Sequence, residues 1–288
     1  MQAVPFDQTI DDAYDNAAHF PDVPEWRERW QQRNAQRVPG AGEQLDLAYG
    51  PEQTQRLDLL PSATPATSAT VLFFHGGFWT RNSKETFRFL ARGFHAAGLN
   101  VAFAGYALAP AARMGRIVSD SLTATRWLGA RMRDLGLAPL PLLVAGWSAG
   151  AHLAALQMSE PNVGGGLGIS GVYDLRPFLS SALNEVLQLD EADAERFSPA
   201  LQVPRRSAPF IVAFGARELD AYRDQSTNFH RALSGAGLAS RLVELPGHHH
   251  HSVLDELFEA NGQLIAQLSA MAKLPPSTPI EARAAHEE

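Results

Sequence analysis

Short apolar runs alternate with longer helix-like stretches through most of this chain. The apolar runs occupy residues 71–74, 100–104, 142–145, 167–169, 210–214 and 242–245, and residues 55–60 alternate enough to form another strand. Nearly continuous apolar runs are typical of parallel strands buried on both faces, and their alternation with helices indicates a mostly parallel sheet. We therefore predict an α/β fold in which helices flank a central sheet on both faces.

The remaining segments predict an arm, a loop and a tail. Residues 11–37 are rich in charged residues and glutamine, and they predict a helical arm within a segment 1–44 that packs on a core domain of residues 45–273. Trp26 and Trp30 are four apart and would share one helix face, where packing on the core is favoured over lining a substrate entrance. Residues 61–70 are typical of a surface loop, and residues 274–288 of a disordered tail.

The run at 142–145 leads into the motif Gly-x-Ser-x-Gly at 146–150, and a helix-like stretch follows at 151–158. A strand-to-helix corner of this kind is so sharp that side chains on either side of the serine are crowded out, which explains the two glycines. The corner lifts the serine hydroxyl above the sheet. The pattern therefore predicts a nucleophile elbow with Ser148 as the candidate nucleophile.

Two adjacent glycines follow the apolar run 71–74, in the motif His-Gly-Gly-Phe-Trp at 75–79. Backbone N–H groups of such a loop, here those of Gly76 and Gly77, can join the N–H of Ala149 to form an oxyanion hole. Taken alone, the motif fits an ordinary glycine-rich turn equally well. Next to a nucleophile elbow, the oxyanion-hole interpretation is favoured.

A serine nucleophile needs a base and a carboxylate that orients the base. The candidates for the base are the four consecutive histidines at 248–251. In this fold the acid follows a strand that lies between the serine and the histidine in sequence. The run at 210–214 is such a strand, and Glu218 and Asp220 come soon after it. These residues alone leave the choice of histidine and of acid open.

Taken together, the motifs make the chain similar to the kynurenine formamidase-like esterases, a family with the α/β-hydrolase fold, from about residue 45 to residue 264. Four segments carry the resemblance: 75–79 resemble the family's His-Gly-Gly-aromatic-Trp loop, 146–154 its elbow, 171–177 with Asn184 its lid-side segment, and 215–218 with Gln225 and Ser226 its acid loop. The resemblance implies a serine hydrolase that requires no cofactor.

The resemblance also implies which residues complete the triad. The family's acid stands three residues after the glycine that ends the strand, which maps onto Glu218, with Asp220 as the alternative. The family usually has aspartate there, so the glutamate is a departure. The family's closing motif of His, an aromatic residue and Ser aligns His250 with the catalytic imidazole, and His251 is a second departure. The implied triad is Ser148, Glu218 and His250.

Aromatic residues cluster near the expected site. Phe78 and Trp79 follow the oxyanion glycines, and Trp147 precedes the nucleophile. Tyr106 and Tyr173 fall on loops that should surround the mouth of the site. Together these five residues predict an apolar, flat-sided substrate pocket. Each could instead pack in the core, and for Trp147 the two interpretations are equally favoured.

Composition excludes several classes of function. The 288 residues carry a net charge of −7 without a Lys/Arg-rich run, which argues against a nucleic-acid partner, and the absence of cysteine excludes a thiol nucleophile. No apolar stretch is long enough for a membrane span, and residues 1–7 lack the pattern of a secretion signal, so we expect a cytoplasmic protein. Adjacent histidines in an extended segment point to opposite sides, which argues against a metal site at 248–251.

These inferences converge on an enzyme with a small-molecule partner. We expect a serine hydrolase that cleaves a small carboxylic ester or an aryl formamide, such as the N-formylkynurenine that the family resemblance implies. A homodimer stays open as an oligomeric state. The alternative is a binding protein on the same scaffold that has lost catalysis, which would need a broken triad, whereas each triad role here has a chemically competent residue.

Overall fold

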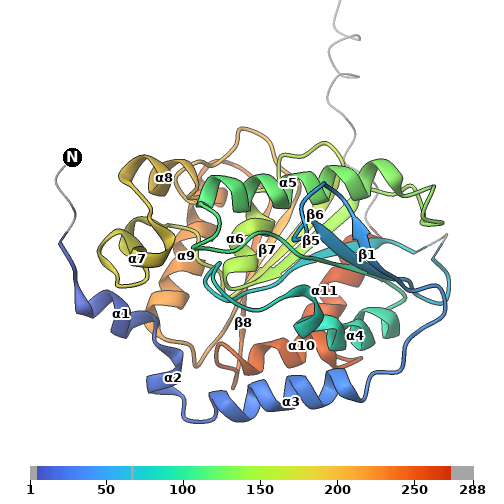
Figure 1. Cartoon of the computed structure of the whole chain (residues 1–288), viewed down its shortest axis with the longest axis horizontal. Coiled ribbons are helices and arrows are strands. Elements are labelled where there is room, and N and C mark those ends of the chain that lie inside the picture. The colour runs from blue at the N-terminus through green and yellow to red at the C-terminus, as the bar shows by residue number, and fades with distance from the viewer. Residues whose placement is uncertain (1–4, 66–67, 274–288) are drawn as a thin grey trace, which may run out of the picture.

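The computed structural model describes residues 5–65 and 68–273. Within them lies an eight-stranded sheet of order β1-β2-β4-β3-β5-β6-β7-β8 (Figure 1). Strand β2 runs antiparallel to β1 and β4, and the other neighbouring strands are parallel. The predicted α/β-hydrolase fold with a mostly parallel sheet is thus confirmed. The strands are β1 (Gln44–Ala48), β2 (Arg56–Leu60), β3 (Thr70–Phe74), β4 (Asn100–Ala104), β5 (Leu142–Trp147), β6 (Val163–Ile169), β7 (Phe210–Gly215) and β8 (Ser240–Leu245).

Helices cover both faces of the sheet, α5 and α6 on one and α3, α4, α10 and α11 on the other (Figure 1). The α-helices are α1 (Gln8–Tyr14), α2 (Asn16–His19), α3 (Val23–Ala35), α4 (Ala91–Ala96), α5 (Met114–Arg131), α6 (Ala149–Ala155), α7 (Asn184–Leu187), α8 (Glu191–Arg196), α9 (Asp220–Gly235), α10 (Asp255–Phe258) and α11 (Gln263–Ala272). The described residues also form three 3-10 helices: η1 (Lys84–Leu90), η2 (Arg176–Ser180) and η3 (Ser252–Leu254).

The burial of strand β3 explains why residues 71–74 form a continuous apolar run. Val71 and Phe73 point into the core layer beneath α4 and α11, whereas Leu72 and Phe74 point into the layer beneath α5. Every residue of this strand is buried. Because β3 lies between β4 and β5 and is covered on both faces, it lacks the polar positions that alternate with apolar ones in a half-exposed strand.

The glycines of β6 allow close packing that the apolar pattern does not reveal. The strand begins at Val163, earlier than the predicted run at 167–169. A Cβ on Gly165 would lie 2.1 Å from Sδ of Met271, and one on Gly166 would lie 2.5 Å from the ring of Phe210. These positions carry no apolar side chain because neighbouring side chains occupy the space.

Over residues 5–44 the N-terminal arm contains three helices, α1, α2 and α3. Asp15 ends α1 and caps α2 through its carboxylate, which accepts from the backbone N–H of Ala17 and Ala18, and α3 starts at Val23. Helix α1 packs near α9 and η2, whereas α3 packs against η1. The predicted tail at 274–288 lies outside the described residues. Over the described part of the chain, the helices are too short or too polar to cross a membrane.

Candidate active site

Ser148 lies at the corner between β5 and α6. Its φ of 57° and ψ of −121° are unfavourable for a residue with a side chain, and strain of this kind is typical of functional corners. A Cβ on Gly146 would lie 2.1 Å from the carbonyl oxygen of Gly150, and one on Gly150 would lie 2.0 Å from that of Phe74. Backbone atoms cannot move away as a flexible side chain could, so both glycines are required at this corner.

The loop after β3 presses its backbone against the elbow. A Cβ on Gly76 would lie 3.0 Å from Cβ of Ser148, and Gly77 has a φ of 124° that favours glycine. The carbonyl oxygen of Gly76 accepts hydrogen bonds from Nδ2 of Asn82 at 3.0 Å and from Nδ1 of His75 at 2.9 Å. Because a trans peptide directs its C=O and N–H to opposite sides, these bonds also orient the N–H of Gly77.

Asn82 and His75 hold this loop in position through these bonds. The sequence analysis named the motif that contains His75 but gave His75 no role, and it did not single out Asn82. For Asn82 the local signal is that asparagine tolerates positive φ, since Asn82 has a φ of 71°. Burial lowers the pKa of His75 to about 4, so its ring is neutral at physiological pH. The hydroxyl of Tyr106 donates to the carbonyl oxygen of His75 at 2.6 Å and the two rings stack. Tyr106 and His75 thus pack together in the core beneath the loop at 75–79.

The acid loop brings Glu218, not Asp220, to the histidine. Nδ1 of His250 donates to Oε2 of Glu218 at 3.3 Å, and both side chains are buried. Oε1 of Glu218 accepts from the backbone N–H of Gly215 and from Oγ of Ser170, each at 2.6 Å. Asp220 is exposed at the start of α9 and pairs with Arg223. Ser170 therefore helps to hold the Glu218 carboxylate in place, and no motif in the sequence predicted this role.

The protonation of the His250 ring follows from this bond. A carboxylate only accepts, so Nδ1 carries the hydrogen and Nε2 is left as the basic ring nitrogen. His250 and Ser148 line the same pocket. The arrangement therefore has the components for moving a proton between a serine hydroxyl and an imidazole that a buried carboxylate orients.

The other three histidines of the run have separate surroundings. His248 lies 3.1 Å from Glu256, and Nε2 of His249 lies 3.1 Å from the carboxylate of Asp22 in the arm. His251 stacks on Trp30, and burial lowers its pKa to about 2. Across the residues that the structure describes, no three His, Asp or Glu side chains are grouped to hold a metal ion.

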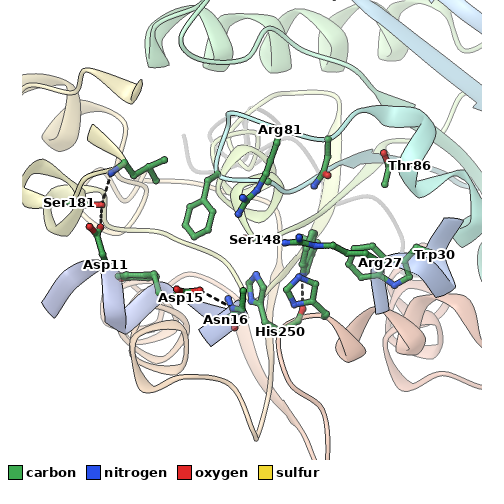
Figure 2. Close-up of a pocket in the computed structure, with 18 of the residues that line it drawn as sticks. Asp11, Asp15, Asn16, Arg27, Trp30, Arg81, Thr86, Ser148, Ser181 and His250 are labelled. Atoms are coloured by element: carbon green, nitrogen blue, oxygen red, sulfur yellow. Dashed lines mark hydrogen bonds between the residues drawn. The ribbon is translucent and has the colours of Figure 1, made fainter. Parts of the chain in front are cut away.

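The pocket at Ser148 has a volume of about 820 Å³ (Figure 2). Phe78 and Trp147, two of the five predicted substrate-binding residues, line it. The arm supplies a large part of the remaining wall. Its lining residues are Asp11, Tyr14, Asp15, Asn16, Ala17, Arg27, Trp30, Gln31 and Asn34. Trp30 packs on Trp147, with ring centroids 5.4 Å apart, as the sequence analysis favoured. Trp30 also lines the pocket, which the sequence analysis had given as the less favoured interpretation.

Three of the predicted substrate-binding residues lie in the core instead, which corrects the sequence analysis. Trp79 is fully buried edge-on against His152, Tyr106 stacks on His75, and Tyr173 stacks on Phe229 with ring centroids 4.2 Å apart. The segments that carry Trp79 and Tyr173 do reach the pocket, through Phe78 and Phe178, but the rings of Trp79 and Tyr173 are buried in the core. The φ of Trp79, for example, is 58°, a local conformation that the sequence pattern does not reveal.

The fold, the strained serine and the His–Glu pair define a serine hydrolase of the α/β-hydrolase class. A family model described as the alpha/beta hydrolase fold matches residues 71–185. The chain is 32% identical over 241 residues to the kynurenine formamidase of Danio rerio, covering 79% of this chain and 81% of that protein. The chain belongs to the kynurenine formamidase-like family of α/β-hydrolases.

Two further proteins outside the formamidases are also similar to this chain. The ethyl acetate hydrolase of Pseudomonas putida is 31% identical over 222 residues, covering 67% of this chain and 69% of that protein. A solved structure from Silicibacter sp. TM1040 superposes with a TM-score of 0.78 at 28% identity, covering 88% of this chain and 97% of that chain. The relatives thus include both a formamidase and an ester hydrolase.

Proposed function

We propose that this hydrolase cleaves a small carboxylic ester or an aryl formamide through an acyl-enzyme intermediate. The observation that carries the proposal is the meeting of three features at one pocket: the strained Ser148, the imidazole of His250, and the buried Glu218 behind that imidazole. The formamidase of Danio rerio supports an aryl formamide such as N-formylkynurenine, and the Pseudomonas enzyme supports a small ester.

In the first half-reaction, Oγ of Ser148 attacks the carbonyl carbon of the substrate while Nε2 of His250 takes the hydroxyl proton. Glu218 stabilises the imidazolium that forms. The backbone N–H groups of Gly76, Gly77 and Ala149 are the proposed donors to the oxyanion, and each such donor is typically worth about 3 kcal/mol in the transition state. His250 then returns the proton to the departing alcohol or arylamine, which leaves the acyl group on the serine.

In the second half-reaction, water replaces the leaving group. His250 removes a proton from the water as the water attacks the acyl carbon, and the same donors stabilise the second oxyanion. Collapse of this intermediate restores the serine hydroxyl and releases the carboxylic acid, which is formate when the substrate is a formamide. No redox partner or cofactor is needed to balance either step.

The test compares kcat/KM for N-formylkynurenine, p-nitrophenyl acetate and p-nitrophenyl butyrate in the wild type and in Ser148→Ala. We expect a burst of nitrophenol equal to the enzyme concentration in the wild type, and a loss of turnover of about 10⁵-fold or more in the variant. Full turnover by Ser148→Ala would refute the mechanism. A faster reaction with the formamide would mark a dedicated formamidase, and a faster reaction with the esters a carboxylesterase.

The alternative of a non-catalytic binding protein makes a different prediction for the same samples. Mass spectrometry after incubation would then find intact ligand bound in a one-to-one ratio, with no product and no acylated Ser148. The buried and oriented His250 argues against this alternative, because a scaffold used only for binding has no need of an imidazole that a carboxylate holds in one tautomer.

A further inference from the structure

Two arginines from different parts of the chain line the pocket that contains Ser148. Arg27 belongs to helix α3 of the arm, and Arg81 follows the His-Gly-Gly loop. Figure 2 shows both side chains directed into the pocket, whereas Asp11 and Asp15 lie on its opposite side. The pocket is therefore electrically asymmetric, with its positive groups gathered at one side.

The backbone that carries Arg27 is held in place. Arg27, Trp30, Gln31 and Asn34 line the pocket together, and the spacing of three and four residues puts them on one face of α3. The side chain of Asn34 anchors that face, since its Nδ2 donates to the carbonyl oxygen of Thr86 at 2.6 Å and its Oδ1 accepts from the N–H of Phe89 at 2.8 Å. These bonds fix the orientation of α3 against the core, and with it the backbone position of Arg27.

The position of Arg81 is fixed by the oxyanion loop itself. Its backbone N–H donates to the carbonyl oxygen of Gly77 at 3.1 Å, and its guanidinium lies 5.5 Å from the ring centroid of Phe78. Arg81, Gly77 and Ser148 line the same pocket, so a group bound by this guanidinium would share the pocket with the proposed nucleophile.

Among the described residues, neither guanidinium has a counter-ion. Within residues 5–65 and 68–273, neither Arg27 nor Arg81 forms an ion pair or donates a side-chain hydrogen bond. The pocket carboxylates have other partners: Asp11 accepts from Ser181 and Ala182, and Asp15 caps α2. Burial, followed by the charge of Arg27, lowers the pKa of Arg81, and the longer-range attraction of Asp15 does not reverse this. Two positive charges therefore face the pocket unpaired.

We propose that Arg27 and Arg81 form an anion-binding subsite, and that the preferred substrate is an ester or amide that carries a carboxylate. Guanidinium groups match the geometry of a carboxylate and bind it through paired hydrogen bonds. A carboxylate that lies between α3 and the oxyanion loop could contact both guanidinium groups, because one arginine comes from each of these segments. This inference rests on the proposed function, because it names a substrate class for the same site.

The experiment uses two pairs of esters that differ in charge. The first pair places the charge on the leaving group, in 3-acetoxybenzoate against the neutral 3-acetoxybenzamide. The second places it on the acyl group, in mono-4-nitrophenyl glutarate against 4-nitrophenyl pentanoate. We expect wild-type kcat/KM to favour the carboxylate by about tenfold or more in at least one pair, mainly through KM, and the preference to shrink between about 0.05 and 0.5 M salt.

The variants are Arg27→Gln and Arg81→Gln, with Arg29→Gln as the matched control. Arg29 lies on the same helix and loses the same charge, but it packs over Trp26 at 4.2 Å and is not part of the pocket wall. Each pocket variant should lower the charged-to-neutral ratio by about tenfold, and the control should keep the wild-type ratio. Equal rates within both pairs, or a preference that survives both pocket substitutions, would overturn the inference.

A binding measurement separates this inference from the proposed function. Calorimetric titration of 3-hydroxybenzoate against 3-hydroxybenzamide requires no catalysis. If the carboxylate binds about tenfold more tightly and Arg81→Gln removes the difference, the subsite stands even if no ester is cleaved. If esters are cleaved but neither the rates nor the titrations distinguish the charged member, the hydrolase function stands and the subsite is refuted.

Discussion

The indole Nε1 of Trp147 donates a hydrogen bond to the backbone carbonyl oxygen of His250 at 2.8 Å. The bond joins the residue before the nucleophile to the proposed catalytic histidine, which lies 103 residues later in the chain. The two rings also pack with centroids 5.0 Å apart. Trp147 therefore lines the pocket and also binds the loop that carries His250 to the corner at Ser148.

Replacing Trp147 by phenylalanine should therefore harm catalysis and stability together. The variant leaves a buried carbonyl without its donor, at a cost of about 1–3 kcal/mol in the free energy of unfolding. We expect kcat to fall about tenfold, because His250 loses a restraint on its position. The measurements are urea unfolding and steady-state kinetics with a neutral ester.

Trp30→Phe is the matched control for that prediction. Trp30 is also buried and lines the pocket, but its Nε1 has no hydrogen-bond partner among the described residues. The substitution removes the same atoms without breaking a hydrogen bond, so it should cost less stability and less kcat than Trp147→Phe. Equal losses in the two variants would show that ring size, rather than the bond to His250, matters.

Substitutions at Glu218 should separate its charge from its length. Glu218→Gln removes the charge that stabilises the imidazolium, and we expect kcat to fall about 10³- to 10⁴-fold. Glu218→Asp keeps the charge but shortens the side chain by one methylene, so its loss should be smaller, about 10- to 100-fold. Steady-state kinetics with p-nitrophenyl acetate give both values.

Asp220→Asn distinguishes the two carboxylates that the sequence left open. Asp220 is exposed and pairs with Arg223, away from His250, so its variant should keep kcat within about twofold. If Asp220→Asn were as inactive as Glu218→Gln, the acid would have been assigned to the wrong residue.

The sequence predicted the parts of the site that depend on local chemistry. The elbow at Ser148 needs glycine at two fixed positions, and the acid follows a strand that is apolar throughout, so both leave a readable pattern. Strand β1 has no recognisable apolar pattern, because most of its residues are exposed. Its pairing with β2 is also irregular in register, and Asp46 within it has a φ of 56°.

The pocket wall could not be predicted because it depends on contacts between distant segments. Helix α3 has few apolar residues, and nothing in its pattern says that Arg27 and Trp30 face a site formed by residues 147–148 and 250–251. Likewise, the inward turn of Trp79 and Tyr173 depends on loop backbone angles and on the space left by neighbouring side chains.

Acid should destabilise the protein through its buried histidines. Burial lowers the pKa to about 4 for His75 and His152 and to about 2 for His251. Below the ordinary value of 6.5, the unfolded chain takes up protons at these rings and the folded chain does not. The free energy of unfolding should therefore fall as the pH drops from about 6.5 towards about 4, by up to about 1.4 kcal/mol per pH unit for each histidine.

His152→Gln tests one member of this group in isolation. Nε2 of His152 donates to the carbonyl oxygen of Phe197 at 2.7 Å, and a glutamine amide can replace that donor without titrating. Urea unfolding between about pH 7.5 and pH 5 should give a shallower pH dependence in the variant, by about one proton. Parallel pH dependences in the wild type and the variant would contradict a neutral, buried His152.

The link between the arm and the histidine run should control substrate affinity. The carboxylate of Asp22 accepts from Nε1 of Trp26 at 3.0 Å and lies 3.1 Å from Nε2 of His249, the neighbour of His250. Asp22→Ala removes both contacts at the start of α3, which walls the pocket. We expect KM to rise severalfold, about three- to tenfold, and kcat to change less, because the wall loosens while the triad stays in place.

Asp12→Ala provides the control for the arm. Asp12 is an exposed carboxylate of α1 that accepts a hydrogen bond from Gln8 and does not line the pocket, so the same change of charge should leave KM near the wild-type value. Proteolysis provides a second readout, since the arm of Asp22→Ala should be cleaved faster than that of Asp12→Ala. If the two variants matched in both KM and proteolysis, the contact between Asp22 and His249 would not hold the arm over the pocket.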